Sequence, residues 1–129
     1  MRIEHVALWT CDLERSRAFY VTYLGGTAND KYTNPRTGFE SYFLHFDDGA
    51  RLELMQMHGI VESAHSPEQQ SLGWIHVAFK LGDRSAVDAL TERLRADGFR
   101  VASAPRVTGD GYYESVVLDP DGNRVELVA

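Results

Sequence analysis

The stretch DGNRVEL at residues 121–127 is nearly duplicated by DGARLEL at residues 48–54, and this repeat decides how the rest of the chain is interpreted. The copies lie 73 positions apart (121 − 48), and each has a glutamate in its middle, Glu53 and Glu126. Three further matches occur upstream in the same order: His5-Val6-Ala7 with His76-Val77-Ala78, residues 35–38 with 105–109, and Glu40-Ser41 with Glu114-Ser115. Four matches in one order indicate that the 129-residue chain consists of two related halves.

Each half predicts the same order of elements, which is strand, helix, strand, strand, strand. In the first half the helix spans Leu13–Leu24, with Asp12 as its N-cap and Gly25 at its end, among strands at 3–9, 27–33, 39–46 and 51–57. In the second half Ser85 caps a helix that Gly98 ends, and strands are expected at 74–81, 99–103, 112–118 and 124–128. We therefore predict an α+β fold in which residues 1–129 form one domain of two tandem βαβββ modules. The modules span about 1–57 and 74–129, with a polar linker at about 58–73.

Strand alternation places the histidine and the glutamate of each half on one face of its sheet. Side chains along a strand point to opposite faces in turn. The apolar residues that must pack under the helices have one parity: Val6, Leu8, Leu52, Leu54, Ile75, Val77, Phe79, Val125 and Leu127. The residues of the other parity, which point away from the helical layer, include His5, Glu53, His76 and Glu126.

Composition and charge exclude several classes of protein. With 43% hydrophobic and 25% charged residues, the chain is typical of a globular protein. A formal net charge of −6 without a basic stripe argues against nucleic-acid binding, and no apolar run is long enough to cross a bilayer. The N-terminus enters a strand pattern at once, which leaves no room for a secretory signal, and the single cysteine cannot form an internal disulfide. We therefore expect a cytoplasmic protein, with Cys11 as a small residue in a strand-to-helix turn rather than a favoured thiolate.

Histidine and glutamate at equivalent places in both halves favour a metal site. Imidazole nitrogen and carboxylate oxygen suit zinc, nickel, iron or manganese, and two of each supply four ligands. Taken singly, each of these residues is as well explained as an exposed residue on a strand, but that interpretation does not account for the recurrence. The remaining histidines have no counterpart in the other half and are interpreted as surface or linker residues: His45, His58 and His65.

Several tracts together resemble the vicinal-oxygen-chelate superfamily, and within it the glyoxalase I and bleomycin-resistance group. They are IEHVALWTCDLERSRAFYVTYLGG, LELM after an Asp-Gly turn, GWIHVAF and DPDGNRVELV, and they cover nearly the whole chain. The resemblance implies paired βαβββ modules that form a curved mixed sheet around a metal-binding cup. It also implies one divalent metal, nickel or zinc, held by His5, Glu53, His76 and Glu126. A homodimer is implied as well, in which the first two ligands come from one chain and the last two from the other.

The complete His-Glu-His-Glu quartet is similar to that of glyoxalase I, the lactoylglutathione lyase. It implies isomerisation of the hemithioacetal of a 2-oxoaldehyde and a thiol, such as glutathione, through an enediolate that the metal stabilises. In this resemblance Glu126 is the catalytic base and Glu53 the second catalytic carboxylate. The Asn-Trp segment that follows the second ligand in typical glyoxalase I proteins is replaced here by residues 55–73. The prediction of a metal isomerase is therefore better founded than that of glutathione as its thiol.

Side chains near the quartet are candidates for substrate binding. Trp9 and Met55 offer an apolar wall, and Tyr112 or Tyr113 offers a hydroxyl. The Pro-Arg loop carries Arg36, which is interpreted either as a holder of an anionic substrate tail or as a solvated turn residue. The same interpretations apply to Arg106 in the equivalent predicted loop at 105–109.

Two function classes stay open. The first is a metal-dependent enzyme acting on a small-molecule thiol adduct. The second is a small-molecule binding protein of the bleomycin-resistance type, which sequesters a toxic molecule without turnover. Tight metal binding favours the enzyme, and a metal-free aromatic groove favours sequestration.

Overall fold

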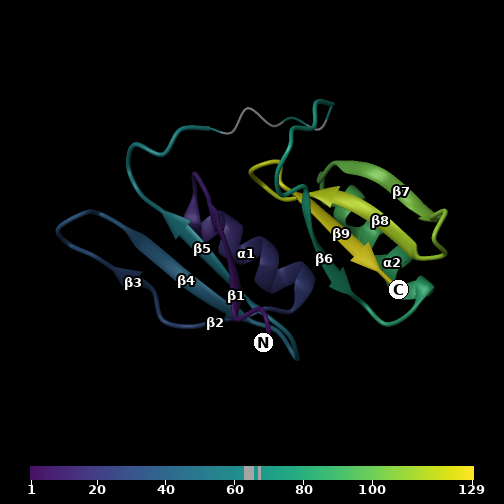
Figure 1. Ribbon diagram of the computed structural model, residues 1–129, viewed down its shortest axis with the longest axis horizontal. Helices are drawn as coiled ribbons and strands as arrows, with labels where there is room; N and C mark the ends of the chain where they lie inside the picture. The colour runs from purple at the N-terminus through teal and green to yellow at the C-terminus, as the bar shows by residue number, and fades with distance from the viewer. Residues whose placement is uncertain (63–65, 67) are drawn as a thin grey trace. The chain divides into compact units, whose positions relative to one another are not determined.

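The computed structural model describes residues 1–62, 66 and 68–129 and divides into two compact units, Met1–Ser63 and Ala64–Ala129 (Figure 1). Each unit contains one helix and one mixed sheet, so the predicted α+β class is confirmed. The division between the units falls within residues 58–73, the segment predicted as a linker. Two residues assigned to that segment from the sequence, His65 and Pro67, lie outside the described residues.

The first unit is a five-stranded sheet with one helix. Its elements are β1 (His5–Trp9), α1 (Leu13–Leu24), β2 (Thr27–Ala28), β3 (Tyr32–Thr33), β4 (Glu40–His45) and β5 (Arg51–Gln56). The strand order is β1-β5-β4-β2 with β3 also paired to β4, and β1 runs parallel to β5. The strand predicted at 27–33 is interrupted because the side chain of Asn29 accepts the backbone N–H of Phe43 (2.8 Å), replacing a bond of the ladder.

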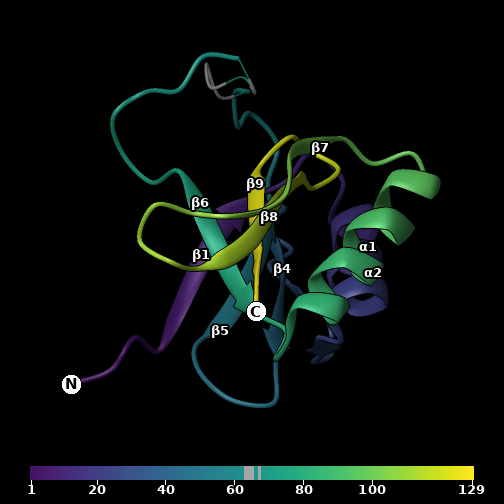
Figure 2. The same ribbon diagram turned by 90° about the vertical axis from the view of Figure 1, so that its right-hand side faces the viewer.

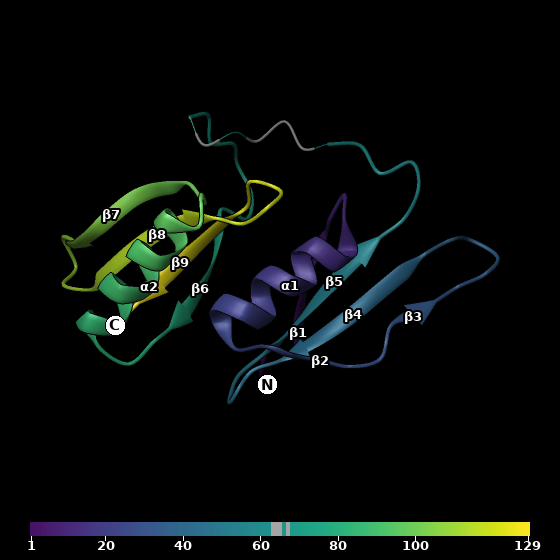
Figure 3. The ribbon, with the colours of Figure 1, turned by 180° about the vertical axis from the view of Figure 1, so that it is seen from behind.

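Helix α1 has the predicted ends. The Asp12 side chain accepts a hydrogen bond from the backbone N–H of Arg15 (3.0 Å), and Gly25 follows the helix at φ 70°, a conformation that favours glycine. Figure 3 shows α1 lying across one face of the β1-β5-β4 sheet. The core between them is made of buried side chains from the helix and from β4 and β5: Leu13, Phe19, Tyr20, Leu44, Leu52 and Leu54. The opposite face carries the side chains of the other parity.

The second unit repeats this plan with four strands. Its elements are β6 (His76–Lys80), α2 (Arg84–Ala96), β7 (Val101–Val107), β8 (Tyr113–Leu118) and β9 (Arg124–Val128). The strand order is β6-β9-β8-β7, and β6 runs parallel to β9. Helix α2 covers one face of this sheet (Figure 2), over a core of Val87, Leu94, Val117, Val125 and Leu127. Neither α1 nor α2, the helices of the described residues, is long and apolar enough to span a membrane.

Two local predictions in the second unit are wrong. The N-cap of α2 is Asp83 and not Ser85, because the Asp83 side chain accepts the backbone N–H of Ala86 at 2.9 Å. Ser85 lies in the first turn, and its hydroxyl donates to Asp83 at 2.7 Å. Ile75, predicted as a core residue, precedes β6 and is 37% exposed.

The predicted loop at 105–109 is partly strand. β7 continues through Pro105 and Arg106. It is the edge strand of its sheet, and its register with β8 shifts between Ser103 and Arg106. Proline is tolerated at an edge or a bulge because it removes no ladder hydrogen bond there. As a result Arg106 lies opposite Glu114 on β8.

Leu54 and Leu127 occupy equivalent places in the repeat, and both are 0% exposed. We expect Leu54→Ala and Leu127→Ala each to lower the free energy of unfolding by about 2–5 kcal/mol, because each leaves a cavity beneath a helix. Urea denaturation followed by circular dichroism measures this, with Leu72→Ala at an exposed position as the control. Losses no larger than that of the control would contradict the packing described.

Candidate functional site

In the first unit a histidine and a glutamate approach each other on the sheet face opposite α1. The parallel register pairs His5 with Arg51 and Ala7 with Glu53, so Glu53 lies diagonally across from His5. Its neighbours in β5 are buried toward α1, which turns Glu53 to the other face. His5 Nε2 and Glu53 Oε2 are 3.9 Å apart, and 40% and 15% of the two side chains are exposed.

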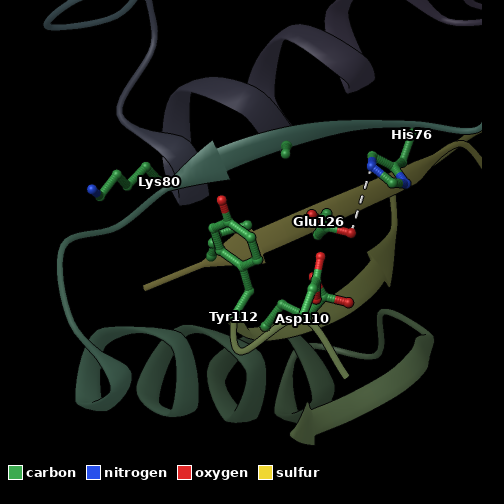
Figure 4. A pocket seen from close by; sticks show the side chains of 8 residues that line it. His76, Lys80, Asp110, Tyr112 and Glu126 are labelled. Carbon is green, nitrogen blue, oxygen red and sulfur yellow. Dashed lines mark ion pairs between the residues drawn. The ribbon is translucent and has the colours of Figure 1, made fainter. Parts of the chain in front are cut away.

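The second unit builds the same pair from equivalent strands. β6 and β9 share the register of β1 and β5, with His76 opposite Arg124 and Ala78 opposite Glu126. His76 Nε2 lies 3.5 Å from Glu126 Oε2, the contact drawn as a dashed line in Figure 4. Their side chains are 37% and 14% exposed, close to the values of the first pair. The residues that the repeat singles out thus form two matched His–Glu pairs, one in each unit.

A group of charged and aromatic side chains holds the histidine of the first pair. The Glu4 carboxylate contacts His5 Nδ1 with one oxygen and the Arg51 guanidinium with the other. Arg51 lies over the ring of Phe43, with Cζ 4.3 Å from the ring centroid, and that ring meets His5 edge-on at 5.4 Å. The hydrogen bond with His5, followed by Arg51, lowers the pKa of the Glu4 carboxyl from its usual value. His5 is therefore held on its Nδ1 side, while Nε2 is the nitrogen that lies toward Glu53.

The second pair lies in a hollow of about 500 Å³. Besides His76 and Glu126 it is lined by Ala78, Lys80, Asp110, Tyr112, Glu114 and Val128. Figure 4 shows Lys80 near one end of β6 and His76 near the other, with Tyr112 and Asp110 on the side of β8. A ligand that reaches this pair meets two further carboxylates, one amine and one phenol.

The pKa of the Glu126 carboxyl is raised above its ordinary value. Burial is the main cause, and Glu114 adds to it through its negative charge and a hydrogen bond between the two carboxyls. The positive charges of His76 and Arg106 oppose this effect. Arg106 Nη2 lies 3.5 Å from Glu114 Oε1. A carboxyl whose pKa is nearer neutrality is better suited to take up and release a proton at working pH.

Both pairs fit the ligand chemistry of a divalent metal. Within residues 1–62, 66 and 68–129 no group of three or more His, Cys, Asp or Glu is placed to hold a metal ion, so each unit offers two ligands. Imidazole and carboxylate atoms that are each about 2.1 Å from a tetrahedral ion lie about 3.4 Å apart. The 3.5 Å of the second pair matches this separation, and the 3.9 Å of the first requires a small approach. Each pair therefore presents one nitrogen and one oxygen atom of the kinds that such ions bind.

Trp9 and Met55 lie side by side on the face that carries the first pair. They are register partners in β1 and β5, and Met55 follows Glu53 by two positions along β5. Trp9 is 40% exposed and meets Phe39 edge-on at 6.0 Å, and Phe39 contacts Tyr32 at 6.1 Å. The first unit thus carries an aromatic surface beside its pair, whereas the second carries a charged hollow.

Tyr113 and Arg36 lie in other surroundings. The Tyr113 hydroxyl donates to Asp88 of α2 at 2.6 Å, so this side chain is on the helix side of its sheet. Alternation along the chain gives the other face to Tyr112, which lines the hollow. Arg36 is exposed in the turn between β3 and β4, where its backbone N–H donates to Asn34.

Four charged residues of these surroundings are not predicted as site residues from the sequence: Glu4, Lys80, Asp110 and Glu114. Strand alternation could have identified two of them. Lys80 lies on the same face of β6 as His76, and Glu114 lies on the same face of β8 as Val116, the register partner of Glu126. The other two lie outside strands, Glu4 before β1 and Asp110 between β7 and β8, where no alternation applies.

Comparison with known proteins gives matches over nearly the whole chain. Residues 2–127 match the family model described as the Glyoxalase/Bleomycin resistance protein/Dioxygenase superfamily. The chain is 29% identical to the protein YqjT of Bacillus subtilis, with 98% of both chains covered. It is 30% identical to the lactoylglutathione lyase of Salmonella typhimurium, with 99% of this chain and 92% of that one covered. A solved structure, the glyoxalase family protein from Enterococcus faecalis, is similar with a TM-score of 0.79 at 26% identity, covering 99% of this chain and 97% of that one.

Glu114→Gln should lower the pKa of Glu126 in the metal-free protein, because it removes the neighbouring charge and the carboxyl–carboxyl hydrogen bond that raise it. A carboxyl whose pKa is higher in the folded than in the unfolded protein lowers the stability of the fold as the pH rises above its pKa in the unfolded chain. The stability lost on raising the pH should therefore be smaller in Glu114→Gln than in the parent. Carbon-13 NMR titration of the glutamate carboxyls measures the pKa. Glu92→Gln, at an exposed position of α2, is the matched control. Identical Glu126 titrations in the two variants would rule out the coupling.

Proposed function

Because this chain belongs to the glyoxalase/bleomycin resistance protein/dioxygenase superfamily, we propose that it is a metal-dependent lyase of the glyoxalase I type. The substrate would be the hemithioacetal of a 2-oxoaldehyde and a thiol, and the product a 2-hydroxyacyl thioester. The observation that carries this proposal is the His–Glu pair repeated in one register in both units. The 30% identity to a lactoylglutathione lyase supports it independently.

Two ordinary ion pairs are a poorer account of these residues. At 3.9 and 3.5 Å the imidazole nitrogens are too far from the glutamate oxygens for good hydrogen bonds. Glu53 and Glu126 are nevertheless largely buried, with about one seventh of each side chain exposed, at 15% and 14%. A carboxylate withdrawn from water is costly unless a cation or several donors compensate it. A divalent cation would compensate both.

We assign one divalent ion, nickel or zinc, to His5, Glu53, His76 and Glu126, which come from both units. The two modules would then complete one vicinal-oxygen-chelate domain, paired within one chain or between the two chains of a homodimer. When bound, the ion would neutralise negative charge that develops on two neighbouring substrate oxygens.

Glu126 is the residue we assign to proton transfer. Its carboxylate would take the proton from the hydroxyl-bearing carbon of the hemithioacetal and return it to the neighbouring carbonyl carbon, while the hydroxyl proton passes to the neighbouring oxygen. Its raised pKa supports this role, since the same group must act first as base and then as acid. Glu53, which has the same place in the first unit, is the second carboxylate of the site.

Side chains of different character would bind the parts of the substrate that do not react. Trp9 and Met55 would form an apolar wall for the aldehyde substituent. Tyr112, rather than Tyr113, would donate a hydroxyl, because it lines the hollow around Glu126. Lys80 in the same hollow suits an anionic group of the thiol. The sequence suggests Arg36 for this role, but Arg36 does not line the hollow. Glutathione or another thiol of low molecular mass meets these requirements.

Sequestration without turnover is the second candidate function. The aromatic surface of Trp9, Phe39 and Tyr32 favours it, since exposed rings suit a flat apolar ligand. A protein of this kind would bind such a ligand equally well with and without metal.

Glu126→Gln tests the proposed function. The amide keeps the shape and one oxygen ligand but cannot accept a proton, so most of the metal should stay while turnover falls roughly 10²–10⁴-fold. The assay is conversion of methylglyoxal with glutathione, and then with other small thiols, by nickel- and zinc-loaded protein, alongside elemental analysis. Glu92→Gln, at an exposed position of α2, is the control, because it makes the same chemical change away from the hollow. Turnover at the parent rate in Glu126→Gln would move the role of base to Glu53, and a parent without turnover would favour sequestration.

Mixing two inactive variants tests whether a dimer shares its sites. One chain carries His5→Ala and Glu53→Ala, and the other carries His76→Ala and Glu126→Ala. Each variant alone should lack metal and activity. If each site takes its pairs from two chains, refolding the mixture should restore roughly a quarter of the parent's sites, since half of the dimers are mixed and each has one complete quartet. Sedimentation confirms the dimer, and no recovery of metal or activity would mean that each site is built within one chain.

A further inference from the structure

We propose that Glu4 is a positioning residue that fixes the ring of His5, so that Nδ1 carries the proton and Nε2 is free to bind the metal. The proposal concerns only residues of the first unit. It rests on the proposed metal role of His5, and it extends that role to a residue just outside the first strand.

The contacts of Glu4 determine which nitrogen of His5 is protonated. One carboxylate oxygen contacts Nδ1 and the other contacts the Arg51 guanidinium, so the carboxylate acts as an acceptor on both sides. In a neutral imidazole the nitrogen that donates to such an acceptor leaves the other with its lone pair. That other nitrogen, Nε2, lies 3.9 Å from Glu53 Oε2. The lone pair is therefore on the side of the ring where the second ligand of the unit lies.

Backbone and side-chain contacts keep Glu4 in place. Its carbonyl accepts the backbone N–H of Arg51 (3.0 Å), which extends the β1–β5 pairing by one residue. The Arg51 side chain lies on the face of His5, because these two residues are register partners. Arg51 in turn packs over Phe43, and Phe43 meets the edge of the His5 ring. Glu4, Arg51 and Phe43 therefore form a closed set of contacts around one side of the imidazole, which we call the Glu4 clamp.

Among the described residues of the second unit no such clamp is formed, although its pair has the same register. Ile75 occupies the place of Glu4, directly before His76, and Val116 occupies the place of Phe43, opposite the ligand glutamate. Arg124 is retained opposite His76. The first pair is thus oriented before a metal arrives, whereas the second lacks this carboxylate. Carboxylates that hold the far nitrogen of a ligand histidine typically strengthen metal binding about 10- to 100-fold.

The experiment measures the tautomer of each histidine in metal-free protein and the metal affinity of the same samples. Nitrogen-15 NMR of the imidazole rings, at a pH where they are neutral, distinguishes a protonated Nδ1 from a protonated Nε2. In the parent, His5 should be in the Nδ1–H form. Glu4→Ala should shift it toward the Nε2–H form and weaken zinc and nickel binding about 10-fold or more, measured by competition with a chromophoric chelator. Glu4→Gln, which keeps an acceptor oxygen, should retain most of the Nδ1–H form and recover part of the affinity.

Two further variants separate positioning from a general loss of structure. Ile75→Glu should supply the missing carboxylate in the second unit, where Arg124 is already opposite His76, and should move His76 toward the Nδ1–H form. Glu92→Ala, at an exposed position of α2, is the control and should leave both histidines and the affinity unchanged. If His5 keeps the same tautomer in Glu4→Ala, or if this variant binds metal as tightly as the parent, the proposal is overturned. If the parent itself binds no metal, the proposed function fails, and the tautomer measurement alone decides whether Glu4 positions His5.

Discussion

The parallel pairing of the first and last strands of each unit is the constraint on which the candidate site depends. In both units it sets histidine opposite arginine and alanine opposite glutamate, so a ligand pair arises from one register. A slip by one residue would turn Glu53 and Glu126 toward the helices and bring leucines to the ligand face, because strand alternation has a period of two. The leucines prevent that slip, since Leu54 and Leu127 are fully buried beneath α1 and α2. The hydrophobic core of each unit therefore also positions its His–Glu pair.

The duplicated plan has diverged most in the surroundings of the two pairs. Beside the first pair lie aromatic rings and the Glu4 clamp, in which each charge has a partner of opposite sign. Beside the second lie Asp110 and Glu114, and burial together with the charge and hydrogen bond of Glu114 raises the pKa of the Glu126 carboxyl. Two glutamates with the same register thus have different charged neighbours. A difference of this kind suits a site in which one carboxylate stays bound and the other exchanges a proton.

Most of the fold could be predicted from the sequence, because the repeat supplies two copies of every signal. Helix α1 and strand β9 have the predicted bounds, and the fold class is the predicted one. The errors occur where one local signal replaced three-dimensional information. Ser85 and Asp83 are both good caps by residue type, and only the chain geometry decides between them. Pro105 is predicted in a loop because residues 105–109 match the turn at 35–38, yet β7 is an edge strand that continues through it. Tyr112 and Tyr113 are both candidates from the sequence, and the structure separates them by strand parity. Glu4 and Asp110 lie where no periodic pattern exists.

The wide separation of the paired strands along the chain has a consequence for synthesis on the ribosome. His5 and Glu53 are 48 positions apart (53 − 5), and His76 and Glu126 are 50 apart (126 − 76), with a helix and a hairpin between them in each case. Closing so long a segment costs chain entropy that is recovered only when the last strand docks. A nascent chain can therefore form α1 and the β4–β5 hairpin before it acquires its first ligand pair. The emerging polypeptide offers isolated histidines and glutamates, which bind metal ions weakly, until each unit has been completed.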